Sequence, residues 1–147
     1  MHYGFVVRPW FKNVAKALRK EPKWFLRDWS GLTDDGARAE TFLACHLLKA
    51  AEGWTDLGFG DFELRYLRDK QKREVDFLLV KDRKPWLLVE VKMGETSLSP
   101  SLAYFQGQTK AAHAFQVVMN LDYQPADGFK AHRPVVVPAK TFLSQLL

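Results

Sequence analysis

Two carboxylates and one lysine interrupt apolar stretches of the chain. Asp76 stands within the apolar run 75–80, and Glu90 and Lys92 stand within the apolar run 87–92. Both runs read as central strands covered on both faces, because apolar and polar residues do not alternate cleanly in them. A charge in such a strand costs free energy unless it is paired or bound to a metal ion. These residues are therefore candidates for catalysis or metal binding.

The register of the two strands decides whether the carboxylates meet. Glu90 and Lys92 share a face because strand side chains repeat every two residues. A three-residue turn over 82–84 places Asp76 opposite Glu90, with Cβ atoms about 4.5–5.5 Å apart. A two-residue turn places the carboxylates on opposite faces. We therefore predict a turn of odd length.

Adjacent carboxylates raise each other's pKa unless a cation lies between them. Hard divalent ions are the natural occupants, Mg²⁺ first and Mn²⁺ as a substitute. Lys92 would then hold negative charge on a phosphate or on an attacking water. A metal together with a lysine suits the hydrolysis of a phosphodiester. The alternative is a structural pair of Lys92 with Asp76 or Glu90 on one sheet face.

Glu40 is the expected fourth member of this site. The turn 33–36 offers an N-cap to a helix over 37–52. On that helix Glu40 shares its direction with Leu43 and Leu47, so it leans toward the sheet. The alternative is a flanking glutamate that reaches solvent or pairs with a lysine.

The elements that must position these residues follow from apolar patterning and turn residues. Besides 37–52, we expect helices over 10–20, 100–113 and 141–147, and strands over 23–27, 62–68, 73–81, 86–93, 115–120 and 134–137. The order from the helix 37–52 onward is helix, three-strand meander, helix, strand, strand, helix. This order predicts an α/β fold in which helices flank a mixed sheet.

Length and composition limit the class of protein. The 147 residues fit a single domain of 17.0 kDa, and the hydrophobic fraction of 47% excludes a disordered chain. No apolar run approaches the roughly 20 residues of a membrane helix, so we expect no membrane partner. The single cysteine, Cys45, excludes an internal disulfide and favours the cytoplasm.

The net charge of +5 is unevenly distributed. Residues 1–27 hold seven basic side chains and one acidic one, a balance of +6, which leaves −1 for the rest. We divide the chain into a basic N-terminal extension, 1–33, and a core, 34–147. The extension suits a polyanion such as nucleic acid. The alternative is a solvated helix face.

A second basic group lies in the turn between two expected strands. Arg68, Lys70, Lys72 and Arg73 are candidates to contact phosphates near the site. The alternative is an ordinary polar hairpin tip.

These motifs together resemble the signature of the PD-(D/E)XK nuclease superfamily. The resemblance rests on Glu40, on 74–77 (EVDF) and on 89–92 (VEVK), although Val75 stands where the signature has proline. The order of elements also resembles the restriction-endonuclease-like α-β-β-β-α-β core. More narrowly, 9–13 (PWFKN) and 22–28 (PKWFLRD) look like the uncharacterised domain found C-terminal to many prokaryotic AAA+-type ATPases.

The resemblance implies a role for each residue of the motif. Asp76 and Glu90 would be metal ligands, Lys92 the catalytic lysine, and Glu40 an accessory acid that helps to hold the metal. Gln106 falls where some relatives place a glutamine near the site. The implied activity is metal-dependent hydrolysis, with DNA favoured over RNA as substrate.

The same resemblance implies an ATPase partner. No G-x-x-x-x-G-K-[ST] phosphate loop occurs in this sequence, so an ATPase module would have to lie elsewhere in the same gene. Two other functions remain open. One is a non-catalytic module that binds nucleic acid or protein beside an ATPase, and the other is a structural domain whose charged cluster is an internal salt-bridge network.

Overall fold

The computed structural model describes residues 4–11, 21–28, 31–125 and 127–146. The strands are β1 (Gly4–Pro9), β2 (Lys23–Leu26), β3 (Phe62–Arg68), β4 (Glu74–Lys81), β5 (Lys84–Lys92), β6 (His113–Val118) and β7 (Val135–Pro138). The helices are α2 (Asp35–Asp56), α3 (Pro100–Thr109) and α4 (Ala139–Ser144), with a 3₁₀ turn η1 (Gly128–Lys130). Within the described residues the strands form one mixed sheet in the order β2-β1-β3-β4-β5-β6-β7. The predicted α/β class is confirmed.

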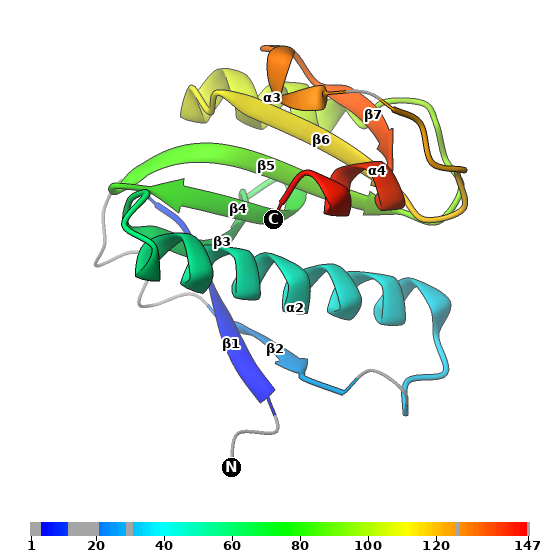
Figure 1. The fold of residues 1–147 in the computed structure, drawn as a ribbon, viewed down its shortest axis with the longest axis horizontal. Helices are drawn as coiled ribbons and strands as arrows, with labels where there is room; N and C mark the ends of the chain where they lie inside the picture. Colours follow the sequence, from blue (N-terminus) through cyan, green and yellow to red (C-terminus); the bar gives the residue numbers. More distant parts are fainter. Residues whose placement is uncertain (1–3, 12–20, 29–30, 126, 147) are drawn as a thin grey trace.

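Helices cover both faces of the sheet (Figure 1). The larger core packs α2 and α4 against one face, with Leu43, Leu47 and Phe142 among its buried side chains. The smaller core packs α3 against the other face through Leu102 and Phe105. We call these the α2 face and the α3 face. Among the described helices, none is both long and apolar enough to cross a membrane.

The predicted boundaries are close to the observed ones. The strand over 62–68 is confirmed to the residue. The helix predicted over 37–52 begins at Asp35, because the Asp34 side chain accepts a hydrogen bond from the N–H of Ala37 at 3.0 Å, and it continues to Asp56. The helix predicted over 100–113 stops at Thr109, where Lys110 takes a left-handed φ of 61°. The helix predicted over 10–20 lies largely outside the described residues.

One strand has no counterpart among the predicted elements. β1 pairs antiparallel with β2 and parallel with β3, so it inserts between two segments that are far apart in sequence. The basic segment 1–33 therefore contributes two strands to the same sheet as the core. This arrangement brings β2 close to the N-terminal half of α2 (Figure 1).

The turn between β4 and β5 corrects one prediction. Lys81 pairs with Lys84, so the turn contains two residues, Asp82 and Arg83, and the predicted odd length is wrong. Both residues have positive φ, 51° and 69°. This is the backbone of a type I′ hairpin turn, whose twist matches that of the flanking strands.

A β-bulge then restores the register that the odd turn was predicted to give. Trp86 is an extra residue on β5, between Pro85, which pairs with Val80, and Leu87, which pairs with Leu79. Beyond the bulge Phe77 pairs with Val89, the pairing that a three-residue turn would give. The two departures from a regular hairpin cancel, and Asp76 still approaches Glu90.

Candidate functional site

Asp76 lies at a bulge in β4. Val75 packs in the core on the α3 face, whereas Phe77 packs in the core on the α2 face. Residues two apart on a regular strand share a face, so one extra residue must intervene. The register with β3 shifts at this point, where Asp76 and Phe77 together oppose Tyr66. Such bulges redirect side chains next to functional sites.

The ladder between β4 and β5 ends at the pair Phe77–Val89, and Asp76 bridges the strands beyond it. Its Oδ2 accepts a hydrogen bond from the backbone N–H of Val91 at 2.8 Å. Its carboxyl group also hydrogen-bonds the side chain of Glu90. The structure therefore brings these two predicted site residues into direct contact.

Glu90 is the most perturbed carboxyl group of this cluster. It lies next to Leu88 and Gln116 on the α3 face and is only 7% exposed. Burial, followed by the charge of Asp76 and the hydrogen bond to it, raises the pKa of Glu90 to about 9, although the charge of Lys92 acts in the opposite direction. At neutral pH Glu90 therefore holds its proton. This pair needs a proton or a cation.

Lys23, which was not among the predicted site residues, joins the cluster from β2. The Nζ of Lys23, on β2, lies 3.4 Å from Oε1 of Glu40 and forms a second ion pair with Glu74. It also stands 4.7 Å from the centre of the Tyr66 ring. Burial alone would lower the pKa of Lys23, but the hydrogen bond to Glu74 and the charges of Glu40, Glu74 and Asp76 raise it. Lys23 is therefore a fixed cation at neutral pH.

Glu40 reaches toward the cluster from α2, and its ion pair with Lys23 is the lysine pairing that the sequence left open as the alternative. Burial raises its pKa, and the charge of Asp76 adds to this effect, while Lys23 opposes it. Glu40 is thus within electrostatic reach of Asp76, but one of its oxygens is engaged by Lys23. The structure brings Glu40 close to the carboxylate pair without joining it to that pair directly.

Lys92 ends β5, two residues beyond Glu90 and on the same face. It is half-buried, and its positive charge acts to lower the pKa of Glu90. Its backbone carbonyl accepts a hydrogen bond from Met119 at 2.9 Å, which ties the end of β5 to the end of β6. The ammonium group therefore stands at the rim of the carboxylate pair on a fixed backbone.

Gln106, which was predicted to lie near the site, is bonded to backbone groups elsewhere in the fold. Its Nε2 donates to the carbonyl oxygens of Ala111 and His132, both at 3.1 Å. These bonds fasten the end of α3 to the segment before β7. Gln106 thus has partners in the scaffold, and the structure records no bond from it to the carboxylate cluster in the described part of the chain.

Gln116 is a second glutamine, and it fixes the segment that follows Lys92. It is fully buried and pairs with Glu90 across the parallel ladder. Its Oε1 accepts from the N–H of Ser99 at 2.8 Å, and its Nε2 donates to the carbonyls of Glu95 and Ser97 at 3.1 and 2.9 Å. One side chain therefore satisfies three backbone groups of the loop that leads from the site into α3.

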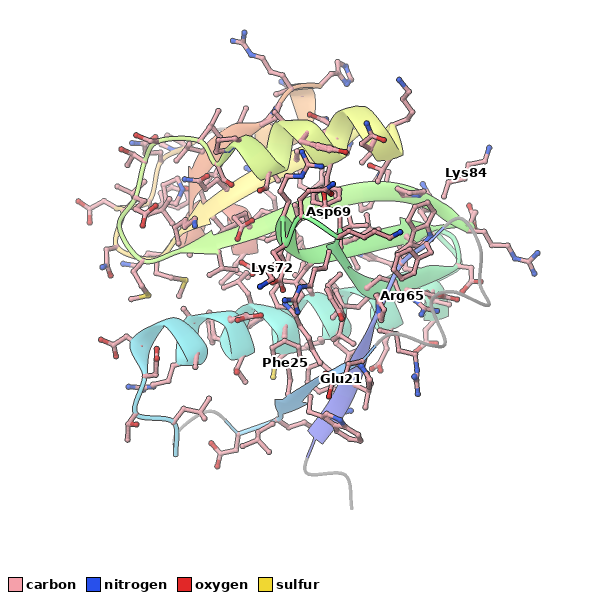
Figure 2. All side chains as sticks on the ribbon, turned by 180° about the vertical axis from the view of Figure 1, so that it is seen from behind. Glu21, Phe25, Arg65, Asp69, Lys72 and Lys84 are labelled. Carbon is pink, nitrogen blue, oxygen red and sulfur yellow. The ribbon has the colours of Figure 1, made fainter. Side chains whose placement is uncertain are left out.

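The four basic residues of the β3–β4 hairpin lie on the turn that leads into Glu74. Figure 2 shows Asp69 and Lys72 on this turn, between α2 and α3 in that view. Arg68, Lys70 and Lys72 are exposed. Arg73 is held by Asp69 at 2.6 Å and stacks over the ring of Tyr104 at 3.5 Å.

The donor atoms of the cluster fit a hard divalent cation in chemistry. Asp76 and Glu90 provide oxygen ligands of the kind that Mg²⁺ prefers, and burial, followed by the charge of Asp76, raises the pKa of Glu90. In the described part of the chain, no three His, Cys, Asp or Glu side chains are arranged to hold one ion. The arrangement therefore offers two carboxylates as ligands for a cation, whereas Glu40 is engaged in its ion pair with Lys23.

Comparison with known protein families gives a match for this chain. Residues 35–142 match a family described as Domain of unknown function (DUF4143). The chain belongs to the DUF4143 family. The match spans Glu40, Asp76, Glu90 and Lys92, whereas Lys23 lies outside it. Searches of curated proteins and of solved structures gave no match to this DUF4143 chain.

Three further residues of this candidate site were not selected from the sequence. Glu74 stands two residues before Asp76 in β4, and this spacing was a usable signal. Gln116 is a polar residue within the apolar run 114–118, which was also a signal. The sequence around Lys23 gave no such signal, because Lys23 meets the glutamates only when β2 packs beside α2.

Proposed function

We propose that this chain is a metal-dependent nuclease domain of the PD-(D/E)XK type that hydrolyses phosphodiester bonds in DNA. The observation that supports it best is the contact between Asp76 and Glu90, in which Glu90 has a pKa of about 9 beside the ammonium of Lys92. Perturbed carboxyl groups beside a lysine are typical of catalytic sites. The order α2-β3-β4-β5-α3-β6 agrees with the core of that superfamily.

Asp76 and Glu90 would hold Mg²⁺ or Mn²⁺, and Glu40 would act as the accessory acid. A bound divalent ion would polarise the phosphoryl oxygen and lower the pKa of a water molecule. Glu90 would release its proton to solvent, because a carboxylate must be charged to ligate. Lys92 would orient the attacking water and stabilise the negative charge that develops on the phosphate oxygens.

A nucleic-acid substrate is proposed because basic side chains flank the cluster, and the choice of DNA follows the resemblance seen in the sequence. The hairpin that leads into Glu74 carries Arg68, Lys70 and Lys72 on its surface. Contacts of this type supply most of the affinity of a protein for a phosphate backbone. In line with the resemblance seen in the sequence, we propose that the domain acts beside an AAA+-type ATPase.

Cleavage assays with matched variants test the nuclease proposal. The purified chain is incubated with single-stranded and plasmid DNA in Mg²⁺, in Mn²⁺ or in EDTA. We expect metal-dependent cleavage that falls at least about 100-fold in Asp76→Asn and in Lys92→Met, since each removes charge from the reacting centre. Glu63→Gln is the control, because Glu63 is an exposed carboxylate on β3 paired only with Arg65 among the described ion pairs. Cleavage that survives in both site variants would overturn the proposal.

A non-catalytic module that binds nucleic acid or protein is the second candidate, and one observation favours it. Lys23 pairs with both Glu40 and Glu74, so part of the cluster is already an internal ion-pair network. This candidate predicts salt-sensitive DNA binding without turnover and little change in that binding on Asp76→Asn. Titration calorimetry with Mn²⁺ separates the two, because only the nuclease requires binding that is lost in Asp76→Asn.

A further inference from the structure

A groove of about 450 Å³ runs between the β3–β4 hairpin and α3. Aromatic side chains line it from two sides, Trp10 from the segment after β1 and Tyr104 from α3. Arg68 and Lys70 line it from the hairpin, and Gln108 adds a polar side chain from α3. The groove thus combines ring surfaces with positive charge.

The charge of the hairpin side of this groove is strongly positive. Residues 68–73 hold four basic side chains and one acidic one, a balance of +3. The acidic residue, Asp69, is already occupied, since it accepts from the backbone N–H groups of Gln71 and Arg73 and from the Arg73 guanidinium. Arg68 and Lys70 are exposed and face the groove. The wall therefore matches a polyanion.

The rings of the groove are held in place by the fold. Trp10 packs against the core on the α3 face, and its backbone N–H donates to the carbonyl of Tyr66 at 2.9 Å. The Tyr104 ring is covered on one side by the guanidinium of Arg73, 3.5 Å from its centre. Rigid rings lose little entropy when a planar group stacks beside them, and the guanidinium of Arg73 fixes the Tyr104 ring from one face.

We propose that this groove binds a single-stranded segment of nucleic acid, with phosphates on Arg68 and Lys70 and an unpaired base against Trp10 and Tyr104. Basic side chains that track a backbone, beside rings that stack bases, are the common design of single-strand sites. In a duplex the base faces are covered by neighbouring bases, so only an unpaired base fits this surface. Binding here does not depend on cleavage.

The groove also has a direction relative to the carboxylate cluster. Arg73, which stacks on Tyr104 of the groove, immediately precedes Glu74 of β4, and Asp76 follows two residues later. A strand lying in the groove would therefore lead along β4 toward Asp76 and Glu90. This second step, the delivery of substrate, rests on the proposed nuclease function, whereas the binding step does not.

The binding step is tested with the full chain in EDTA, so that cleavage plays no part. Fluorescence anisotropy follows a labelled single-stranded oligonucleotide as salt is varied, with a duplex of the same sequence as competitor. In Arg68→Gln/Lys70→Gln the slope of log K against log salt should fall in magnitude by about 1.4, or about 0.7 for each lost phosphate contact. Arg83→Gln/Lys84→Gln is the matched control, because it removes equal charge from the exposed β4–β5 turn. Figure 2 shows Lys84 well separated from Asp69 and Lys72.

Variants of Tyr104 test the stacking. Tyr104→Leu should weaken binding at least about fivefold without changing the salt slope, and Tyr104→Phe should retain the wild-type affinity. The proposal is overturned if the control pair reduces the slope as much as the groove pair, or if Tyr104→Leu binds like wild type. Equal competition by duplex DNA or by polyglutamate would also overturn it. If the wild-type chain binds the single strand as expected but cleaves no DNA in Mg²⁺ or Mn²⁺, that result would count against the nuclease function alone.

Discussion

The carboxylate of Asp76 accepts a hydrogen bond from the backbone N–H of Val91 at 2.8 Å, beyond the point where the β4–β5 ladder ends. A side chain thus replaces the missing ladder bond. The same carboxyl group is also hydrogen-bonded to the side chain of Glu90. Asp76 therefore has a structural role and a chemical role that substitutions can separate.

Asp76→Asn and Asp76→Ala should differ in stability but not in metal binding. The asparagine amide oxygen can still accept from Val91, whereas alanine leaves that N–H without a partner and should cost about 1–3 kcal/mol of unfolding free energy. Both variants remove the charge, so both should lose Mn²⁺ binding by calorimetry. Urea unfolding measures the first difference. Equal stability of the two variants would show that the bond to Val91 contributes little.

The raised pKa of Glu90 predicts a pH dependence of stability. The folded state holds the Glu90 proton up to about pH 9, whereas the unfolded state releases it near the ordinary value of 4.5. Between these values the native state binds more protons, so its stability declines as pH rises. Urea midpoints measured in EDTA from pH 5 to pH 9 should therefore fall more steeply in wild type than in Glu90→Gln. Parallel profiles in the two proteins would contradict the assignment.

Lys23 should stabilise the fold through Glu40 and Glu74. Lys23→Gln leaves both glutamates near Asp76 without their cation, and we expect a loss of about 1–3 kcal/mol, less than for a fully buried pair because the Lys23 side chain is 24% exposed. Thermal or urea unfolding measures it. Lys84→Gln, on an exposed turn, is the control and should change stability by less than about 0.5 kcal/mol.

A double-mutant cycle isolates the pair with Glu74. Because removing Glu74 also removes a repulsive neighbour, Lys23→Gln/Glu74→Gln should lose less than the sum of the single variants. Additive losses would indicate that Lys23 acts through Glu40 or through the Tyr66 ring instead.

The core of the site was predictable from the sequence because strand periodicity is local. Charges at Asp76, Glu90 and Lys92 within apolar runs were sufficient to select the right pair of strands. The predicted turn length was nevertheless wrong. The extra residue at Trp86 compensates for the two-residue turn, and nothing in the local pattern distinguishes this combination from a regular odd turn.

The remaining contributors depend on contacts between distant segments. Lys23 precedes Glu40 by 17 residues and Glu74 by 51, and it meets them only because β1 places β2 beside α2. β1 itself was missed because a short apolar run before Pro9 lacks clear alternation. Burial and pairing of this kind are properties of the assembled sheet, which single-sequence patterns do not record.

Gln116 should hold the loop that connects the site to α3. In Gln116→Leu the N–H of Ser99 and the carbonyls of Glu95 and Ser97 lose their side-chain partner, and only the groups that water can reach are compensated. We expect a loss of about 2 kcal/mol of unfolding free energy, with faster amide hydrogen exchange over 95–99.

The change should extend to Lys92, which ends the strand just before this loop. If the nuclease proposal is right, cleavage by Gln116→Leu should fall more than its unfolded fraction accounts for, because a displaced ammonium stabilises the reacting phosphate less well. Gln71→Leu, an exposed glutamine on the β3–β4 turn, is the control for stability and exchange. Exchange over 95–99 that matches wild type in Gln116→Leu would show that the loop is held by other contacts.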